Sequence, residues 1–393
     1  MKIAMLGSGV VACLYAKSLH SQRGKDFIYT IYSRNIDNAK RFADDYFLQH
    51  FTDDMEAAIN HPEVEVVLIC LPNYLHATAV AACAKAKKHV LCTKPLGRTA
   101  AEAKYMLDLV EEAGIFGGYL EDLCYATKFI KSSHNIKKGS IGRVLSTKST
   151  QVHAGPHSDW FLNKEKAGGG AIIDLASNCV EIGRNFIGKD VKPIEVMCTA
   201  STQVYPIEAE DNAIGWVKYD NGAIAQFDVS WTSKAGMDFR NEVMGTEGTI
   251  WLNNQRAGFE MFSTEKFGNN DESADPNSGW LFPEGDSLHE LGFTNMFTDM
   301  FNAIENKRPS LETFYDGYVV NAILDAAFLS AKTKQWQSVV LEDWRGQNII
   351  AKKEKLVSFN ADFYLIKEEL LPNGDLNRIL KNKISGEVEQ HTW

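Results

Sequence analysis

The stretch KIAMLGSGVVACLYA, residues 2–16, decides the fold of the amino-terminal part of the chain. A short apolar strand ends at a Gly-Ser-Gly turn, and a helical pattern begins directly after the second glycine. This is the G-x-G-x-x-A form of a dinucleotide-binding loop. The first glycine permits a tight turn, the second lets a pyrophosphate approach the backbone at the helix amino terminus, and the small last residue lets the helix pack closely. We therefore expect a dinucleotide to contact Gly7, Gly9, Val10, Val11 and Ala12.

The pattern around this loop predicts a parallel sheet. Alternation of short apolar runs with longer amphipathic ones favours right-handed crossovers between parallel strands. Strands are expected at 2–7, 27–33, 64–71, 89–93 and 115–120, and helices at 10–21, 36–45, 75–87 and 99–113. Residues 1–122 are therefore predicted to form a doubly wound α/β domain of the Rossmann type.

Beyond residue 122 the hydrophobic pattern changes. Period-two segments, joined in places by turns such as Asp-Asn-Gly at 220–222, predict strands. These segments are 143–152, 194–204, 213–219, 223–232, 239–245 and 249–252, and helical patterns follow at 288–306 and 314–335. Residues 123–393 are thus predicted to form an α+β domain with an antiparallel sheet. The polar end of the chain, from about residue 347, is expected to be a partly helical tail.

The composition limits the kinds of partner. The chain has 41 basic and 51 acidic residues and no basic stripe, so nucleic acid is not expected as a partner. No uninterrupted apolar run reaches the length of about 18 residues that spans a membrane. The seven cysteines show neither disulfide nor metal-ligand spacing. We therefore expect reduced thiols, no metal and a cytoplasmic location.

Two residues at the end of the second strand bear on the choice of cofactor. Ser33 and Arg34 offer a hydroxyl and a guanidinium at the place where a dinucleotide-binding fold contacts the ribose. This pair suits a 2′-phosphate better than a bare ribose, which favours NADP(H) over NAD(H). In the alternative, Arg34 stacks on the adenine and the cofactor is NAD(H).

Lys94 and Pro95 lie just past the end of the strand 89–93, at the sheet edge where open α/β sheets bind ligands. Hydride transfer to or from a hydroxyl-bearing carbon needs a matched proton transfer. A partly desolvated lysine beside a cationic nicotinamide would have a lowered pKa suited to that task. The alternative is a surface lysine at the start of a helix.

Several motifs in order resemble the glucose-fructose oxidoreductase, inositol dehydrogenase and rhizopine catabolism (Gfo/Idh/MocA) family. They are the loop at 7–12, Leu71-Pro72-Asn73-Tyr74-Leu75-His76, Lys94-Pro95-Leu96-Gly97, Gly139-Ser140-Ile141-Gly142 and the run from Gly168 to Asp174. The resemblance covers roughly residues 1–335. It implies a Rossmann domain, a second domain with a large open sheet, an NAD(P) cofactor and a sugar or cyclitol substrate. It also implies a homodimer or homotetramer.

The resemblance assigns roles to individual residues. It implies that Lys94 is catalytic, together with the Asp and His of a D-x-x-x-H motif, and that Leu71, Pro72, Asn73, His76 and Pro95 line the cofactor. The chain departs from the family at Thr93, where Glu is usual, and at Asn178, where the pattern asks for His. A carboxamide has no useful pKa, so Asn178 can orient a hydroxyl but cannot carry its proton.

Other residues could complete the site. Asp174 and Asn178 are four apart and share one face of a helix, so both could reach one substrate. The proton then goes to Lys94 or to another histidine, and His157 and His153 are candidates. Trp160 could stack on a sugar, and Glu121 could bind its hydroxyls. For each of these side chains the alternative is a structural role.

The glycine run 168–170 follows no strand that would make it a second phosphate loop. We expect its backbone to pass close to the nicotinamide and the substrate instead. The leading hypothesis is an NAD(P)-dependent dehydrogenase or reductase of sugars or cyclitols. Redox-neutral glycoside cleavage through transient oxidation is one alternative, and a catalytically inactive, cofactor-binding regulator is the other.

Overall fold

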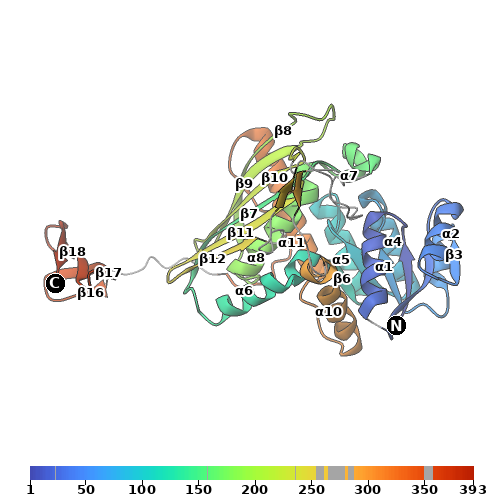
Figure 1. Ribbon diagram of the computed structural model, residues 1–393, viewed down its shortest axis with the longest axis horizontal. Helices are drawn as coiled ribbons and strands as arrows, with labels where there is room; N and C mark the ends of the chain where they lie inside the picture. The colour runs from blue at the N-terminus through green and yellow to red at the C-terminus, as the bar shows by residue number, and fades with distance from the viewer. Residues whose placement is uncertain are drawn as a thin grey trace. The chain divides into compact units, whose positions relative to one another are not determined.

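The computed structural model of the protein describes residues 1–22, 24–156, 158–234, 236–253, 261–263, 279–281, 287–348 and 357–393. The chain divides into two compact units, Met1–Ile349 and Ile350–Trp393 (Figure 1). The first unit contains two large sheets, and the second contains one small sheet. Among the described residues, no helix combines the length and the apolar character needed to cross a membrane.

The first sheet has six parallel strands in the order β3-β2-β1-β4-β5-β6, which confirms the predicted Rossmann topology. Its strands are β1 (Lys2–Leu6), β2 (Phe27–Tyr32), β3 (His50–Thr52), β4 (Val66–Ile69), β5 (His89–Thr93) and β6 (Gly117–Leu120). The connecting helices are α1 (Val10–Gln22), α2 (Ile36–Asp45), α3 (Met55–Asn60), α4 (His76–Ala86) and α5 (Ala100–Ala113). All four residues of β4 are buried, as expected for a strand covered on both faces. The sequence analysis missed β3 and α3, which are short and mostly exposed.

The second sheet has seven strands in the order β12-β11-β7-β10-β9-β8-β15. They are β7 (Val144–Val152), β8 (Pro193–Ser201), β9 (Asn212–Tyr219), β10 (Ile224–Ser230), β11 (Asp238–Gly245), β12 (Thr249–Asn253) and β15 (Gln337–Ser338). The sheet is mostly antiparallel, as predicted, but β7 and β10 are parallel neighbours. The long connection between these two strands contains α8, β8 and β9, and so allows a parallel pair.

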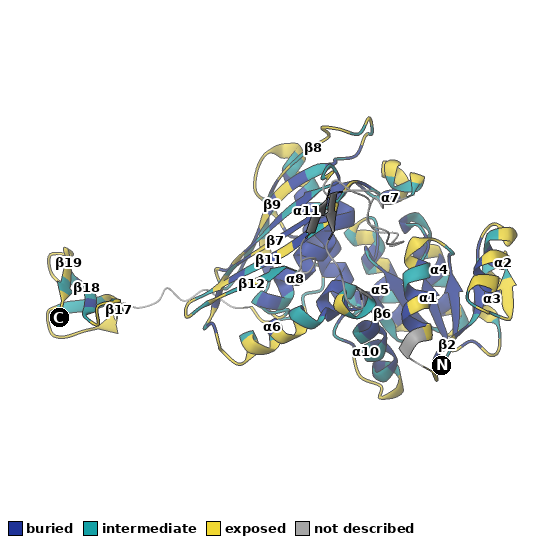
Figure 2. Cartoon of the chain, in the orientation of Figure 1, coloured by how far each residue is buried: buried dark blue, intermediate teal, exposed yellow. Residues whose placement is uncertain are grey.

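Helices cover one face of this sheet, and within the described ranges no helix packs on the other face. The helices α8 (Ser177–Ile187) and α11 (Phe314–Thr333) pack on the inner face, where alternate strand residues are buried (Figure 2). On the outer face, alternation leaves a row of partly exposed apolar side chains, which are Ile214, Trp216, Ile224, Met244 and Trp251. With this outer face, the seven-stranded sheet matches the large open sheet that the family resemblance implies.

The remaining elements of the first unit connect or cover these sheets. They are α6 (Thr127–Lys137), α7 (Lys164–Ala167), α9 (Ser287–Glu290), α10 (Phe293–Glu305) and the paired strands β13 (Met261–Ser263) and β14 (Gly279–Leu281). Short 3-10 turns occupy Asn73–Leu75, Asp122–Tyr125 and Asp159–Leu162, and a π-helical turn occupies Ile172–Ala176. Although α10 follows the second sheet in sequence, it packs against α1, and Phe297 meets Tyr15 edge-on at 5.2 Å between ring centroids.

The second unit is a four-stranded antiparallel sheet and contains no helix among its described residues, 357–393. Its strands are β16 (Val357–Ser358), β17 (Phe363–Leu370), β18 (Leu376–Asn382) and β19 (Val388–Thr392). The expectation of a partly helical tail is therefore wrong. Gly374 and Gly386 adopt positive φ in the two turns that join the long strands, and these turns set the hairpins despite the polar composition.

Candidate active site

The loop between β1 and α1 has the shape that a dinucleotide-binding loop requires. Gly7 has a φ of +108°, and a Cβ at this position would lie 2.4 Å from the carbonyl oxygen of Cys70. A Cβ on Gly9 would meet no atom within 4 Å, so the space before the helix is open. Val10 and Val11 are exposed in the first turn of α1, whereas Ala12 is buried against the sheet. The residues present fit a pyrophosphate at the amino terminus of α1.

Ser33 and Arg34 follow β2 directly, at the carboxyl edge of the sheet. Ser8 Oγ donates to Ser33 Oγ at 3.0 Å, which ties the glycine loop to the end of β2. Arg34 is exposed beside this contact. Both residues therefore lie within the region where a dinucleotide-binding fold contacts the ribose.

The loop after β4 is held by two buried polar side chains. Asn73 Nδ2 donates to the carbonyl of Ala167 at 2.7 Å and so links this loop to the second domain. His76 is completely buried, with one ring nitrogen 3.0 Å from the carbonyl of Leu96 and the other 2.9 Å from that of Leu71. Burial lowers the pKa of His76. Its imidazole therefore positions the loops that carry Leu71 and Lys94.

Lys94 directly follows β5 and precedes a cis peptide bond to Pro95, and its side chain reaches the second domain. Its Nζ lies 2.6 Å from the backbone carbonyl of Asp174 and 3.1 Å from Asp174 Oδ1. Burial lowers the pKa of Lys94, but the nearby carboxyl groups, Asp174 above all, outweigh burial and raise the pKa above its ordinary value. The expected lowering of this pKa therefore does not hold for the chain alone.

Asp174 lies close to three other side chains of the site, those of Lys94, Trp231 and His153. Its Oδ2 accepts from Trp231 Nε1 at 3.0 Å and lies 3.6 Å from His153 Nε2. Burial opposes ionisation, yet Lys94 and His153 together hold the pKa of Asp174 well below its usual range. Asp174 lies in the π-helical turn, and π turns shift carbonyl groups out of the regular helical ladder. This shift explains how the Asp174 carbonyl can accept from Lys94.

His153 is oriented by the backbone. The N–H of Gly155 donates to His153 Nδ1 at 2.9 Å, so the neutral ring carries its proton on Nε2, which faces Asp174. Trp160 stacks on Phe161 with 3.8 Å between ring centroids, so one face of the indole is occupied. His157 lies outside the described residues.

Asn178 is buried and contacts protein groups. With its nitrogen facing Glu121, the amide donates to Glu121 Oε2 at 2.9 Å and accepts from Gln151 Nε2 at 3.1 Å. Asp174 thus contacts Lys94, whereas the amide of Asn178 contacts Glu121 and Gln151. That both side chains reach one substrate stays a prediction.

That carboxylate, Glu121, is completely buried at the end of β6. Burial and the charge of Asp122 raise the pKa of Glu121 well above its ordinary value. Burial also raises the pKa of Asp122, to about 6, against the opposing effect of Lys94. Lys94 is therefore flanked by one ionised carboxylate, Asp174, and by one carboxyl group that holds its proton readily.

Each glycine of the run has protein atoms close to the position that a Cβ would take. That its backbone passes close to the nicotinamide and the substrate stays a prediction. A Cβ on Gly168 would lie 2.7 Å from Arg98 Cβ, one on Gly169 would lie 2.4 Å from the ring of Phe328, and one on Gly170 would lie 1.9 Å from the carbonyl oxygen of Glu210. The Glu210 carboxylate also accepts from the N–H groups of Gly170 and Ile172 at 2.8 and 2.9 Å. The glycines let the segment that carries Asp174 pack into a narrow space.

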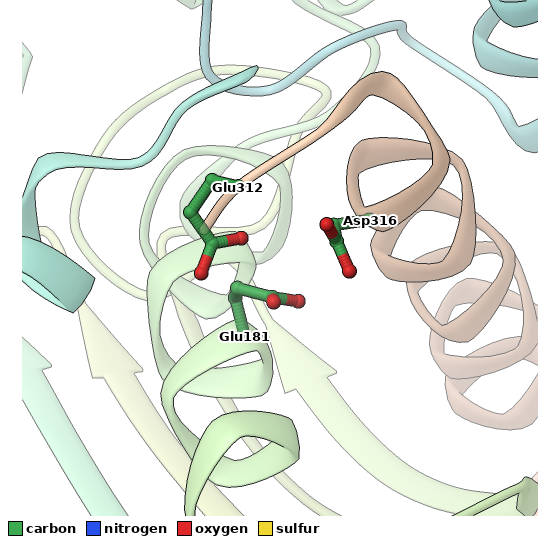
Figure 3. Close-up of side chains that lie close together, drawn as sticks. All are labelled: Glu181, Glu312 and Asp316. Atoms are coloured by element: carbon green, nitrogen blue, oxygen red, sulfur yellow. The ribbon is translucent and has the colours of Figure 1, made fainter. Parts of the chain in front are cut away.

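A group of buried acidic side chains lies away from this site. Glu181 on α8, Glu312 before α11 and Asp316 in the first turn of α11 have carboxylate oxygens within 4.8 Å of one another (Figure 3). Lys189 Nζ lies 3.0 Å from Glu181, 2.9 Å from Glu312 and 3.2 Å from Asp316. Arg184 adds a contact of 2.5 Å to Glu181. An ammonium group therefore fills the centre that a metal ion would need, and we interpret the group as a structural ion network.

Two polar contacts of the site cannot be predicted from the sequence. They are the contact of Trp231 with Asp174 and that of Gln151 with Asn178. Gln151 lies in β7 and Trp231 directly follows β10, and these strands are far apart in sequence but adjacent in the sheet, where Val229 pairs with Gln151. The only sequence signal is that both side chains end predicted strands. Their contacts with Asp174 and Asn178 depend on the sheet order.

Parts of both domains match models of known protein families. Residues 1–117 match the model of an oxidoreductase family with an NAD-binding Rossmann fold, and residues 129–251 match the GFO/IDH/MocA C-terminal domain. The chain is 27% identical to levoglucosan dehydrogenase of Pseudarthrobacter phenanthrenivorans over 77% of this chain and 85% of that protein. It is 26% identical to myo-inositol 2-dehydrogenase of Thermotoga maritima over 72% of this chain and 82% of the relative. The structure of GenD2 from gentamicin A biosynthesis in complex with NAD is similar with a TM-score of 0.81 and 26% identity, over 87% of this chain and 97% of GenD2.

Proposed function

Since the chain belongs to the Gfo/Idh/MocA family of oxidoreductases, we propose that it oxidises or reduces a secondary hydroxyl or ketone of a sugar, a sugar derivative or an inositol with a nicotinamide cofactor. The observation that carries the proposal is the contact between Lys94 and Asp174 at the carboxyl edge of the cofactor-binding sheet. Ligands of open α/β sheets bind at this edge. The related levoglucosan and myo-inositol dehydrogenases support a sugar or cyclitol as the substrate.

In the proposed mechanism, a bound nicotinamide supplies the hydride chemistry and Lys94 moves the proton. The Nζ of Lys94 takes the proton of the substrate hydroxyl in oxidation and returns it to the oxygen in reduction. Asp174 holds Lys94 in place and keeps its negative charge beside the ammonium. Trp231 fixes the carboxylate of Asp174.

We assign the substrate contacts to side chains around this pair. His153, Trp160 and His157 would bind the sugar hydroxyls and rings, since the first two lie in or near the loops around Asp174. Asn178, which cannot carry a proton, would orient the carboxyl group of Glu121 near Lys94. In this proposal Lys94 therefore replaces the histidine of the family motif as the proton carrier.

We propose NADP(H) as the preferred cofactor, with NAD(H) as the alternative. Arg34 supplies a guanidinium at the end of β2, and guanidinium groups bind phosphates in a bidentate way. The related GenD2 structure contains NAD, which supports the alternative. The cofactor-binding residues would be those of the glycine loop, Ser33, Arg34 and the loop that contains Leu71, Pro72, Asn73 and His76, together with Lys94 and Pro95.

We also propose that the protein assembles as a homodimer or homotetramer through the outer face of the seven-stranded sheet. Trp251 is 74% exposed at one side of this face, and Trp216 and Ile224 are partly exposed near its middle. Contiguous apolar surface of this kind on a sheet marks an interaction site.

The test is a panel of pyranosides, free sugars and inositols with the purified protein and either NAD+ or NADP+. At least one substrate should increase the absorbance of the reduced cofactor, and the reaction should be faster with NADP+. Glycoside cleavage without net reduction of the cofactor would favour the redox-neutral alternative. Cofactor binding with no turnover on the whole panel would favour the regulator.

The Arg34→Ala variant tests the cofactor preference. Loss of one charged contact to a phosphate should lower kcat/KM for NADP+ by about 10- to 100-fold and leave that for NAD+ nearly unchanged. The Arg41→Ala variant is the matched control, because Arg41 lies on α2 and donates to Asn38 at 3.0 Å. If Arg34→Ala changes both cofactors equally, Arg34 does not bind a 2′-phosphate.

A further inference from the structure

The carboxy-terminal unit buries very little apolar surface. Among its described residues, 357–393, Leu380 is the only hydrophobic side chain in the buried class. Leu370 and Val388 are 73% and 59% exposed. Small sheets of this kind need a partner surface, because isolated hairpins are at best marginally stable in water.

One long edge of this sheet is open. Within the described part of the unit, β19 pairs with β18 alone. Leu376 and Trp393 exchange N–H···O bonds of 2.9 and 3.1 Å, and Asn382 donates to the carbonyl of Glu387 at 2.8 Å. Because bonded pairs alternate along an antiparallel ladder, the N–H and C=O groups of Val388, Gln390 and Thr392 point to the free edge.

This edge lacks several of the devices that keep strands apart. The sequence of β19, VEQHT, contains neither Pro nor Lys, which are the residues that commonly protect edges. Nor is the strand unusually short, since it spans Val388–Thr392. The edge is therefore free to pair with another strand.

The strand is complementary to itself. If two copies of β19 pair antiparallel about a two-fold axis at Gln390, Glu389 of each copy faces His391 of the other, and Val388 faces Thr392. Opposite charges and β-branched side chains are favourable cross-strand neighbours. The side chains of Glu389 and His391 already lie 3.2 Å apart within one chain. An unrelated peptide would not be expected to provide this symmetric match.

We propose that the β19 edges of two copies of this chain pair antiparallel around Gln390, so that two four-stranded sheets become one sheet. The occupant of the edge is thus a second copy of the chain. This contact is separate from the outer face of the large sheet and does not depend on the proposed activity.

Disulfide trapping with the full-length chain tests the proposal. In the Gln390→Cys variant the two introduced thiols would lie opposite each other with about 5.5 Å between Cα atoms, within the range for a disulfide. Mild oxidation should give a covalent dimer on non-reducing gels. The Ser385→Cys variant is the matched control, because Ser385 is exposed in the preceding turn and far from the proposed axis. Equal trapping of the two variants would overturn the proposal.

Charge exchange in the trapping variant separates self-pairing from other contacts. Adding Glu389→Lys places Lys opposite His391 and should slow trapping by at least about threefold. Adding His391→Glu as well restores opposite charges and should restore the rate. If the single change has no effect, or if the double change does not restore trapping, the antiparallel register about Gln390 is wrong.

Discussion

The Lys94→Met variant is expected to lose about 10²- to 10⁴-fold in kcat/KM for hydroxyl oxidation, the usual contribution of a positioned proton carrier. Methionine has a similar length but no proton to transfer. It also removes the contacts of Nζ with the carbonyl and carboxylate of Asp174, at 2.6 and 3.1 Å. Cofactor binding, followed by fluorescence of the reduced cofactor, should remain, since the glycine loop is untouched.

The control for this prediction is Lys104→Met. Lys104 pairs with Asp108 at 2.7 Å on the surface of α5, and its replacement should leave kcat/KM within about twofold, since exposed pairs contribute little. A Lys94→Met enzyme that keeps more than a tenth of the normal kcat/KM would contradict the role of Lys94.

The pH dependence has a defined direction. Because the pKa of Lys94 is raised above its ordinary value in the chain alone, the free enzyme holds Lys94 as an ammonium at neutral pH. An ammonium can donate a proton but cannot accept one. Ketone reduction should therefore run well at pH 7, whereas hydroxyl oxidation should speed up as the pH rises toward the raised pKa of Lys94.

The Lys189→Met variant is expected to destabilise the protein by about 3–5 kcal/mol, the cost of leaving buried charges without their partner. Lys189 Nζ contacts Glu181, Glu312 and Asp316 within 3.2 Å, and all three carboxylates are buried. In the part of the chain that the structure describes, Arg184 would be the remaining cation in contact with this group. Urea unfolding followed by circular dichroism would measure the shift in midpoint.

Lys40→Met provides the comparison for Lys189→Met. Lys40 pairs with Asp44 at 2.7 Å on the exposed face of α2, so its replacement should cost less than about 1 kcal/mol. Equal effects of the two replacements on the free energy of unfolding would contradict the prediction that the buried carboxylates depend on Lys189 for charge balance.

Those parts of the site that lie within one element or one turn can be predicted from the sequence. The loop at Gly7 and the position of Lys94 after β5 depend on local geometry and on strand order in an alternating pattern, and both follow from spacing. The contact of Trp231 with Asp174 depends on the packing of the π-helical turn against β10, which Trp231 follows. No periodicity encodes which strands become neighbours across such a distance.

Other features of the chain could not be predicted because they depend on contacts between segments that are distant in sequence or on strands with a weak pattern. The glycines at 168–170 are small because Arg98, Phe328 and Glu210 approach them from distant segments, and sequence spacing does not reveal such approaches. Asn178 stands where the family motif has His. Its partners come from two different sheets, since Glu121 follows β6 of the first sheet and Gln151 lies in β7 of the second. The carboxy-terminal strands mix apolar and polar residues without strict alternation, as in FYLIKEEL at 363–370, so a period-two pattern carries little signal there.

The position of α10 has a consequence for synthesis. Its side chains Phe293, Phe297 and Phe301 belong to the same apolar core as Met5 and Tyr15 of the first domain. A ribosome therefore releases β1 and α1 long before it makes the helix that completes their packing. The nucleotide-binding half must remain unfinished, with apolar surface uncovered, until translation has passed residue 305.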